Sequence, residues 1–174
     1  MAQSETMTSP EKTPTEPSFE HMFTLRSEHR SGTLRLVAEA TDSIAWLDDN
    51  YSQSGINSPE FDELIRGFLR ADSKRRLRML LNSDYFLQTQ APRFTNLLRT
   101  FSAQISTRLV HRDDWQGQAF LLVDGRHILT RAQADRWRGF LAFDACSQAE
   151  QLALKFDRIW DNGTPCLSPT TLGL

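Results

Sequence analysis

The chain has few of the features that mark a secreted or membrane-spanning protein. It holds only two cysteines in 174 residues, Cys146 and Cys166, and they form no CxxC pair. We expect both thiols to be reduced, as in a cytoplasmic protein, but the sequence leaves a disulfide between them open. The longest apolar runs, such as Ala119–Val123, are far too short to span a membrane. The N-terminus lacks the apolar core of a secretory signal.

Charge and motif content exclude further classes. The chain carries 20 basic and 22 acidic residues, and without residues 1–20 the balance is 19 basic to 18 acidic. Because positive and negative charges are so evenly balanced, we expect no general surface for binding nucleic acid or membranes. No GxGxxG or GxxxxGK[ST] phosphate loop is present. None of the four histidines stands at a metal-ligand spacing from Cys, Asp or Glu, so we expect neither a metal nor another cofactor.

The two ends of the chain differ from its middle. Residues 1–20 are rich in Ser, Thr, Pro and Glu, and we predict a disordered tail because they cannot bury enough apolar surface. Residues 164–174 contain two prolines and are predicted to be an irregular tail. Residues 21–163 then form a single domain, which is long enough to bury a core.

Strand and helix patterns alternate through this domain. The expected strands are Met22–Ser27, Ser43–Asn50, Arg75–Asn82, Ile105–Arg112, Gln118–Val123, His127–Arg131 and Gly139–Phe143, and the expected helices are Gly32–Asp42, one from Ser58, Arg93–Phe101 and Ser147–Asn162. Ser58 followed by Pro59 is a strong helix start. Ser147 with Glu150 matches a capping box. The order predicts an α/β fold with a mixed β-sheet and helices on both faces.

The stretch Gly117–Arg126, GQAFLLVDGR, reads as a buried strand that ends in a hairpin turn. Together with the element order, it resembles one half-domain of the phospholipase D (PLD) superfamily, whose active members carry HxKxxxxD on a strand. In that alignment the motif aspartate falls on Asp124 and the next residue on Gly125, while Gly117 and Ala119 stand at the histidine and lysine positions. The chain is also similar to a bacterial family of uncharacterised, single-copy PLD-like domains whose motif is degenerate in the same way.

This resemblance implies a pseudoenzyme. In active members the histidine is the nucleophile, a second copy's histidine is the general acid and the lysine holds the phosphate oxygens. Gly117 and Ala119 can supply neither a nucleophile nor a positive charge. The resemblance therefore implies a non-catalytic PLD-like binding or scaffold module for an unknown protein partner. Single-copy relatives often dimerise, so a homodimer is also implied.

Two polar segments at strand ends are further candidates. In HRDDW, His111 and Asp113 could line the former cleft as ligand or catalytic residues, or could belong to a polar loop. Asp48 and Asp49 could bind a cation or act as acid and base, but adjacent residues in an extended segment point to opposite sides. The alternative for this pair is a turn with an Asx cap.

The basic segments carry the last candidates. The residues that stand where active relatives complete the phosphate site are Arg131, Arg136, Trp137 and Arg138. They form either a ligand or protein interface or a structural set in which the arginines pair with Asp135 and Asp124. The cluster Lys74–Arg78 is either an anion contact or a solvated or edge face. Two alternative functions therefore stay open: nucleic-acid or phosphate-ligand binding through these arginines, and a phosphodiesterase-related enzyme with a rebuilt site.

Overall fold

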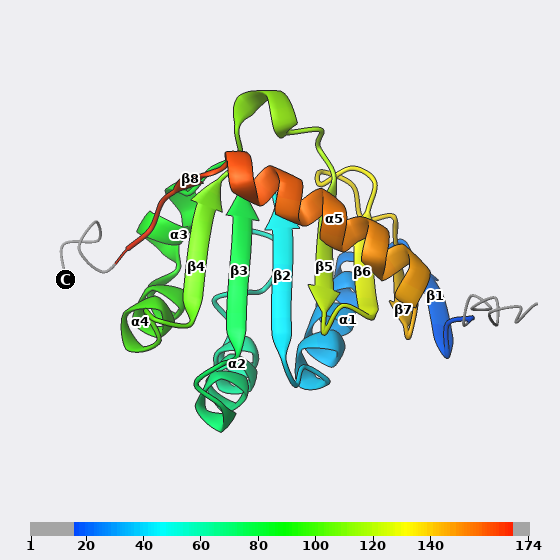
Figure 1. The fold of residues 1–174 in the computed structure, drawn as a ribbon, viewed down its shortest axis with the longest axis horizontal. Helices are drawn as coiled ribbons and strands as arrows, with labels where there is room; N and C mark the ends of the chain where they lie inside the picture. The colour runs from blue at the N-terminus through cyan, green and yellow to red at the C-terminus, as the bar shows by residue number, and fades with distance from the viewer. Residues whose placement is uncertain (1–15, 169–174) are drawn as a thin grey trace, which may run out of the picture.

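Two layers of helices enclose a mixed sheet of eight strands in the computed structural model, which describes residues 16–168 (Figure 1). The strands are β1 (Phe19–Phe23), β2 (Ser43–Asp48), β3 (Arg76–Leu81), β4 (Ile105–Leu109), β5 (Ala119–Val123), β6 (His127–Arg131), β7 (Gly139–Phe143) and β8 (Thr164–Pro165). The helices are α1 (Arg26–Ala38), α2 (Pro59–Ala71), α3 (Tyr85–Gln90), α4 (Pro92–Thr100) and α5 (Cys146–Asn162), with a short 3-10 helix η1 (Arg112–Asp114).

The strands lie in the order β1-β7-β6-β5-β2-β3-β4-β8. The three strands β2, β3 and β4 are parallel to one another, whereas β5 pairs antiparallel with β2. From β5 through β6 and β7 to β1, every pairing is antiparallel, and β8 closes the other edge against β4. Helices α1 to α4 cover one face, and α5 crosses the other diagonally (Figure 1). The predicted mixed α/β fold with helices on both faces is thereby confirmed.

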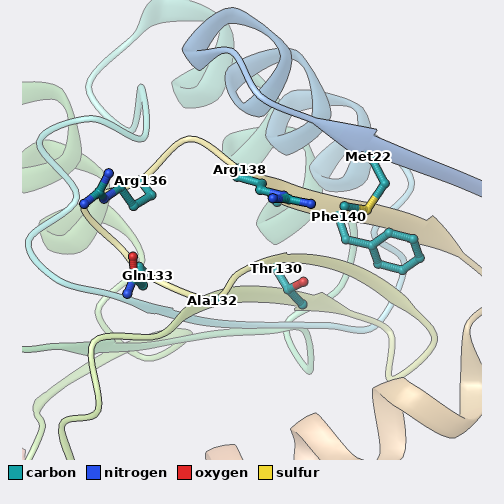
Figure 2. Close-up of a pocket in the computed structure, with 8 residues that line it drawn as sticks. Met22, Thr130, Ala132, Gln133, Arg136, Arg138 and Phe140 are labelled. Atoms are coloured by element: carbon teal, nitrogen blue, oxygen red, sulfur yellow. The ribbon is translucent and has the colours of Figure 1, made fainter.

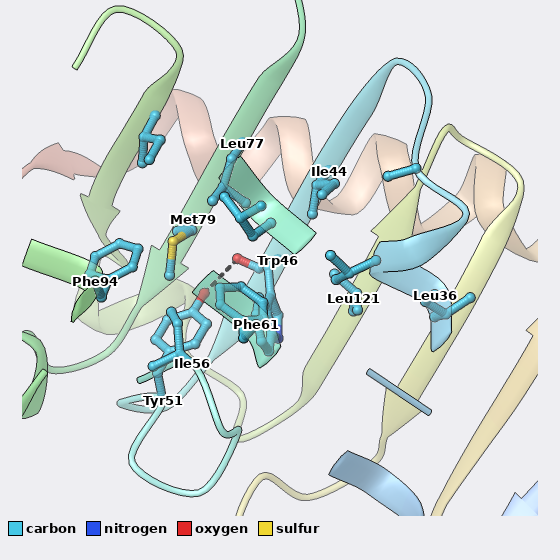
Figure 3. Packing of buried hydrophobic residues seen from close by; sticks show 14 of the residues in the cluster. Leu36, Ile44, Trp46, Tyr51, Ile56, Phe61, Leu77, Met79, Phe94 and Leu121 are labelled. Atoms are coloured by element: carbon cyan, nitrogen blue, oxygen red, sulfur yellow. Dashed lines mark hydrogen bonds between the residues drawn. The ribbon is translucent and has the colours of Figure 1, made fainter. Parts of the chain in front are cut away.

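The larger hydrophobic core lies under α1, α2 and α4, with aromatic rings at its centre (Figure 3). The Trp46 ring lies 5.0 Å from the Tyr51 ring and 5.6 Å from the Phe61 ring, measured between centroids. The Tyr51 hydroxyl lies within hydrogen-bond distance of the carbonyl oxygens of Trp46 and Leu80, at 2.8 and 2.9 Å. Tyr51 therefore anchors the loop after β2 to the two neighbouring strands, and its burial raises its pKa well above the ordinary value.

Helix α2 begins as its sequence predicts. The Ser58 hydroxyl accepts a hydrogen bond from the Phe61 N–H at 3.2 Å, and Pro59 occupies the first helical position. The apolar face is buried through Phe61, Ile65, Phe68 and Leu69. Burial of such side chains contributes about 1.5–3 kcal/mol each, so this face fixes α2 on the sheet.

Several predicted boundaries are wrong at the start of the domain. Strand β1 covers Phe19–Phe23, so it overlaps the segment predicted to be disordered and ends before Ser27. Helix α1 begins six residues before Gly32. Glu28 caps it, because its carboxylate accepts hydrogen bonds from the N–H groups of Thr24 and Leu25, both at 3.0 Å. A lone edge strand with four exposed residues out of five gives no alternating pattern to recognise.

The C-terminal part also differs from its prediction. Helix α5 begins at Cys146 after Ala145 and has no side-chain cap, so the capping box predicted for Ser147 is wrong. Thr164 and Pro165 form strand β8 within the predicted irregular tail. The other predicted tail segments, residues 1–15 and 169–174, lie outside the described residues.

The two cysteines lie far apart. Cys146 begins α5, whereas Cys166 follows β8 beyond the other end of that helix, roughly 24 Å away along its axis. Both thiols are free, and the Cys166 Sγ donates to the Thr107 hydroxyl at 3.4 Å. The disulfide left open by the sequence is therefore excluded. Within residues 16–168, none of the helices combines the length and apolar character that crossing a membrane requires.

Candidate functional site

The residues at the predicted motif positions lie in one lateral row at an end of the sheet. Ala119 of β5 pairs directly with Arg131 of β6. On the other side of β5, the register that pairs Phe120 with Leu47 places Ala119 beside Asp48 of β2. Directly paired residues project on the same face of a sheet. Asp48, Ala119 and Arg131 therefore form a row on the face that α1 and α2 cover.

Arg131 uses this row to reach across β5. Its Nη2 atom donates to the Asp48 carboxylate at 2.9 Å, and the two side chains are only 2% and 7% exposed. Because β5 lies between β6 and β2, the arginine side chain passes over the methyl group of Ala119. Burial raises the pKa of Asp48, and the positive charge of Arg131 opposes that rise. The ion pair of Arg131 with Asp48 thus lies over Ala119, the residue at the predicted lysine position.

The other contacts of Arg131 hold it in place. Its Nη1 atom donates to the Ala134 carbonyl oxygen at 2.5 Å. The Trp137 ring stacks on the guanidinium group, with 5.2 Å from the guanidinium carbon to the ring centroid. Arg26 approaches the same ring at 5.9 Å. Trp137 therefore acts as a cover for the buried ion pair. Arg131 has a structural role, but its acidic partner is Asp48 and not the predicted Asp135 or Asp124.

His29 of α1 lies against the same cover. Its ring centroid is 5.7 Å from that of Phe23 and 5.5 Å from that of Trp137. Its Nδ1 atom is buried and has no hydrogen-bond partner within residues 16–168. Burial, followed by the charge of Arg131, lowers the pKa of His29 to about 3. At neutral pH this histidine is consequently an uncharged part of the core.

Asp124 holds the backbone rather than a ligand. Its carboxylate accepts hydrogen bonds from the N–H groups of Thr41, Asp42 and Ser43 and from the Thr41 hydroxyl, at 2.8–2.9 Å. Burial alone would raise the pKa of Asp124, but these hydrogen bonds lower it below the ordinary value. Asp124 and Gly125 have φ angles of 53° and 63°, as the predicted hairpin turn requires. The predicted pairing of Asp124 with an arginine of the 131–138 segment is wrong for Arg131.

Gly117 lies beside a small cavity of about 340 Å³, the strand-end cavity, which is lined by Asp49, Trp115, Gln116, Gly117, Gln133, Ala134 and Asp135. Gly117 adopts a φ of 74°, and its carbonyl oxygen accepts a hydrogen bond from the Ala134 N–H at 2.6 Å. The lining contains two carboxylates and no lysine or arginine. Since stabilisation of a phosphoryl group needs positive charge or aligned donors, this cavity is poorly suited to it.

His111 and Asp113 lie apart from this row, in and next to η1, which follows β4 in the chain. The His111 Nδ1 accepts a hydrogen bond from the Asp113 N–H at 3.4 Å, and the two side chains are 58% and 88% exposed. Neither residue lines the strand-end cavity. The structure therefore does not bring these two candidates together with Arg131. Within residues 16–168, no three His, Cys, Asp or Glu side chains gather in a way that could hold a metal ion.

A second lateral row lies on the opposite face of the sheet. Register pairs Phe120 with Thr130, Thr130 with Phe140, and Phe140 with Met22. Helix α5 covers the first of these through Phe156, whose ring centroid is 6.3 Å from that of Phe120. The rest of the row forms the floor of a cavity of about 610 Å³, the sheet-face pocket, lined by Met22, Thr130, Ala132, Gln133, Arg136, Arg138, Gly139 and Phe140 (Figure 2).

The predicted candidates Arg136 and Arg138 therefore belong to the sheet-face pocket, whereas Arg131 and Trp137 belong to the buried ion pair. The sequence indicated the arginines but not Met22, Thr130 or Phe140. Alternation along β6 and β7 would place Thr130 and Phe140 on one face. It could not show that α5 leaves them uncovered.

The predicted basic cluster Lys74–Arg78 divides between two environments. Arg75 turns inward, where it donates to the Phe68 carbonyl oxygen at 3.2 Å and stacks on the Phe68 ring. Arg76 and Arg78 project toward the α5 side of β3, and Arg108 joins them from β4. Because β3 lies inside the sheet, the interpretation of this segment as a protected edge is wrong. These three arginines, Arg76, Arg78 and Arg108, are called the arginine face below.

Several solved structures have this fold. Nuc from Salmonella typhimurium, described as a phospholipase D family member, aligns with a TM-score of 0.61 and 14% identity over 88% of this chain and 100% of its own. NucT from Helicobacter pylori aligns with 0.57 and 9% over 85% and 99%. The archaeal chromatin protein TrmBL2, described as showing a novel mode of DNA binding, aligns with 0.63 and 12% over 89% of this chain. The chain spans only 56% of TrmBL2.

Identities this low show the fold alone, and they confirm the predicted phospholipase D-like fold. No curated protein matches the chain. A domain family, described as "Domain of unknown function (DUF7931)", matches residues 25–171. This match covers most of the sequence and includes both lateral rows except Met22. The chain therefore belongs to the DUF7931 family.

Proposed function

We propose that this chain is a non-catalytic binding module built on a phospholipase D-like half-domain. The observation that carries the proposal is the side chain of Arg131, which lies across Ala119 and pairs with Asp48. This arrangement uses the positive charge internally and leaves no free cation at the predicted lysine position. Gly117 supplies no nucleophile at the predicted histidine position. What remains is a rigid sheet with two open surfaces, the sheet-face pocket and the arginine face.

The proposal is tested by a phosphodiesterase assay on the purified chain with bis(p-nitrophenyl) phosphate and a single-stranded oligonucleotide. We expect no hydrolysis above that of a buffer control. A rebuilt active site would instead use the carboxylates of the strand-end cavity. Hydrolysis that copurifies with the folded chain and is abolished by Asp49→Asn or Asp135→Asn would contradict the proposal. Hydrolysis that separates from the folded chain on a sizing column comes from a contaminant, and the proposal then stands.

A second candidate function is binding of a nucleic-acid backbone at the arginine face. Arg78 is 39% exposed and pairs with Asp157, while its guanidinium group stacks on the Phe156 ring at 5.0 Å. Arg108 stacks on the Trp160 ring at 4.7 Å. Arginines held on aromatic rings at a sheet surface are suited to phosphate contacts and to stacked bases.

This candidate is tested by fluorescence anisotropy with a single-stranded oligonucleotide over a range of salt concentrations. Each phosphate contact contributes a slope of about −0.7 to the plot of log affinity against log salt. Arg76→Gln combined with Arg78→Gln should therefore reduce the slope by about 1.4. Arg112→Gln, which removes an exposed arginine in η1, is the matched control. Equal losses in the two variants, or no salt dependence, would reject the arginine face as the binding surface.

A further inference from the structure

The sheet-face pocket has an apolar end and a charged end. At one end, Met22 and Phe140 lie side by side on the paired strands β1 and β7 (Figure 2). Met22 is 56% exposed. At the other end, Gln133 and Arg136 extend from the loop that joins β6 to β7 (Figure 2). Arg138 lies between the two ends and points toward Phe140 (Figure 2). The pocket is therefore amphipathic along its length.

The positive charges of the two arginines of this pocket are available to a ligand. Many arginines of the described chain are engaged, such as Arg66 with Asp62 and Arg126 with Asp144. The side chains of Arg136 and Arg138 form no hydrogen bond or ion pair within residues 16–168, and no carboxylate lines the pocket. Two unneutralised guanidinium groups beside one cavity favour an anion, and their forked donors match a carboxylate or a phosphate.

We propose that the sheet-face pocket binds a small amphipathic anion, which places a carboxylate or phosphate head at Arg138 and an apolar chain over Phe140 and Met22, while Arg136 adds positive charge at the far end of the pocket. The volume of about 610 Å³ lies within the usual range for small-molecule pockets, about 300–1,000 Å³. The apolar floor disfavours a purely inorganic anion, because the exposed surface of Met22 and Phe140 would stay in water. The positive charge disfavours fatty amines and metal ions.

This inference deepens the proposed function, since it names the ligand class of the module, and it rests on that function in treating the pocket as a binding site. The two fail separately. Hydrolysis that depends on Asp49 or Asp135 would contradict the non-catalytic function and leave ligand binding here unchanged. Absence of ligand binding would overturn this inference and leave the missing hydrolysis unchanged.

The test is isothermal titration of the full chain with octanoate and with octyl phosphate, both below their micelle concentrations. We expect at least one of them to bind with a stoichiometry of one, and octylamine and inorganic phosphate not to bind. The head group is identified by whichever of the two anions binds more tightly. Failure of both anions to bind, or equal binding of octylamine, would overturn the inference.

Variants locate the site. Arg138→Gln should weaken anion binding about tenfold, because a hydrogen bond to a charged group is lost. Met22→Gln should weaken the octyl ligand and should spare a short-chain anion of the same head group. Arg112→Gln is the matched control, since it removes an exposed arginine outside the pocket. Binding that Arg138→Gln leaves unchanged, or that Arg112→Gln weakens equally, would place the ligand elsewhere and overturn the assignment.

Discussion

The Nη2 atom of Arg131 lies 2.9 Å from a carboxylate oxygen of Asp48, although the two residues are 83 positions apart in the chain. The contact joins β6 to β2 across the intervening strand β5. It fixes the end of the sheet at which the predicted motif positions lie. It also gives this part of the domain a polar centre that tolerates few changes, because each partner is buried and depends on the other.

Removal of one partner should therefore be more harmful than removal of both. Arg131→Met leaves the Asp48 carboxylate buried without its charge partner, and we expect a loss of about 3–5 kcal/mol in the free energy of unfolding. The double variant Arg131→Met/Asp48→Leu should recover most of that loss, because no uncompensated charge remains. Urea unfolding at pH 7 measures both. Additive losses from the two substitutions would show that the pair is not energetically coupled.

Ala119 should be intolerant of lysine, the residue that the predicted motif alignment expects at this position. Ala119→Lys would bury a second positive charge beside Arg131 with one carboxylate for both, and we expect a loss of about 3 kcal/mol or more in unfolding free energy. In the background of Arg131→Ala, the introduced lysine can pair with Asp48, so the same substitution should be much less harmful. Urea unfolding of the two single variants and the double variant measures the coupling. Equal effects of Ala119→Lys in both backgrounds would contradict the row geometry.

Local signals predicted much of the fold. Ser58 and Pro59 fix the start of α2, and the hairpin turn at Asp124 and Gly125 follows from residues that accept positive φ angles. These features depend on neighbours within a few positions. The Asp48–Arg131 pair does not, because it depends on the insertion of β5 beside β2 rather than beside β4. The only signal of this pair in the sequence was the charged residue at the end of each of the two apolar strands, Asp48 in β2 and Arg131 in β6.

The open surfaces of the sheet were still less accessible to prediction. Phe140 and Thr130 alternate with buried neighbours as any strand residues do, and their exposure depends on the diagonal path of α5. That path is set by the packing of Phe156 and Ile159 on the sheet, and no residue pattern within β6 or β7 reveals it. Residue patterns thus identified the elements and the arginines, whereas helix placement determined which of them form a pocket.

His29 should make the stability depend on pH. Its folded pKa of about 3 lies below the ordinary value of 6.5, so between these values the unfolded chain binds a proton that the folded chain does not. The contribution of this group to the free energy of unfolding is fully present above pH 6.5. It falls as the pH drops toward 3, by up to about 1.4 kcal/mol per pH unit.

His29→Phe keeps a ring between Phe23 and Trp137 and removes the titration. The difference in unfolding free energy between the original chain and this variant should shift in favour of the variant as the pH falls from 7 to 4. Other titrating groups, including Asp48, are present in both proteins and largely cancel. Urea unfolding at several pH values measures the difference, and a difference that does not change with pH would contradict the buried neutral histidine.

Asp124 should stabilise the fold at neutral pH, and this contribution should be lost in acid. Its pKa is lowered in the folded chain, so its contribution is present above the unfolded value of 3.8 and is lost as the pH falls through the folded value. Asp124→Asn keeps the shape but removes acceptor capacity toward Thr41, Asp42 and Ser43, and we expect a loss of about 1–3 kcal/mol at pH 7. Thermal unfolding should show that this loss shrinks below pH 4. A loss that is the same at pH 3 and pH 7 would argue against the carboxylate hydrogen bonds.

Two glycine substitutions give a matched pair. Gly139 pairs with Arg131 on one side and with Phe23 on the other, and a Cβ atom there would clash with the Phe23 ring and the Thr130 carbonyl oxygen. Gly139→Ala should therefore cost about 1–3 kcal/mol, because the backbone oxygen cannot move away as a flexible side chain can. Gly67 lies within α2, and nothing lies within 4 Å of a Cβ placed on it.

Gly67→Ala should accordingly stabilise the chain by about 0.5–1 kcal/mol through helix propensity. Thermal unfolding of the two alanine variants side by side measures opposite shifts in Tm for the same chemical change. By register, the row of Asp48, Ala119 and Arg131 continues through Gly139 of β7 to Phe23 of β1. If Gly139→Ala is neutral, neither the Phe23 ring nor the Thr130 carbonyl oxygen lies against Gly139, and this continuation of the row is wrong. The smallest residues of that row thus define its geometry, since Ala119 admits the arginine and Gly139 admits the phenylalanine ring.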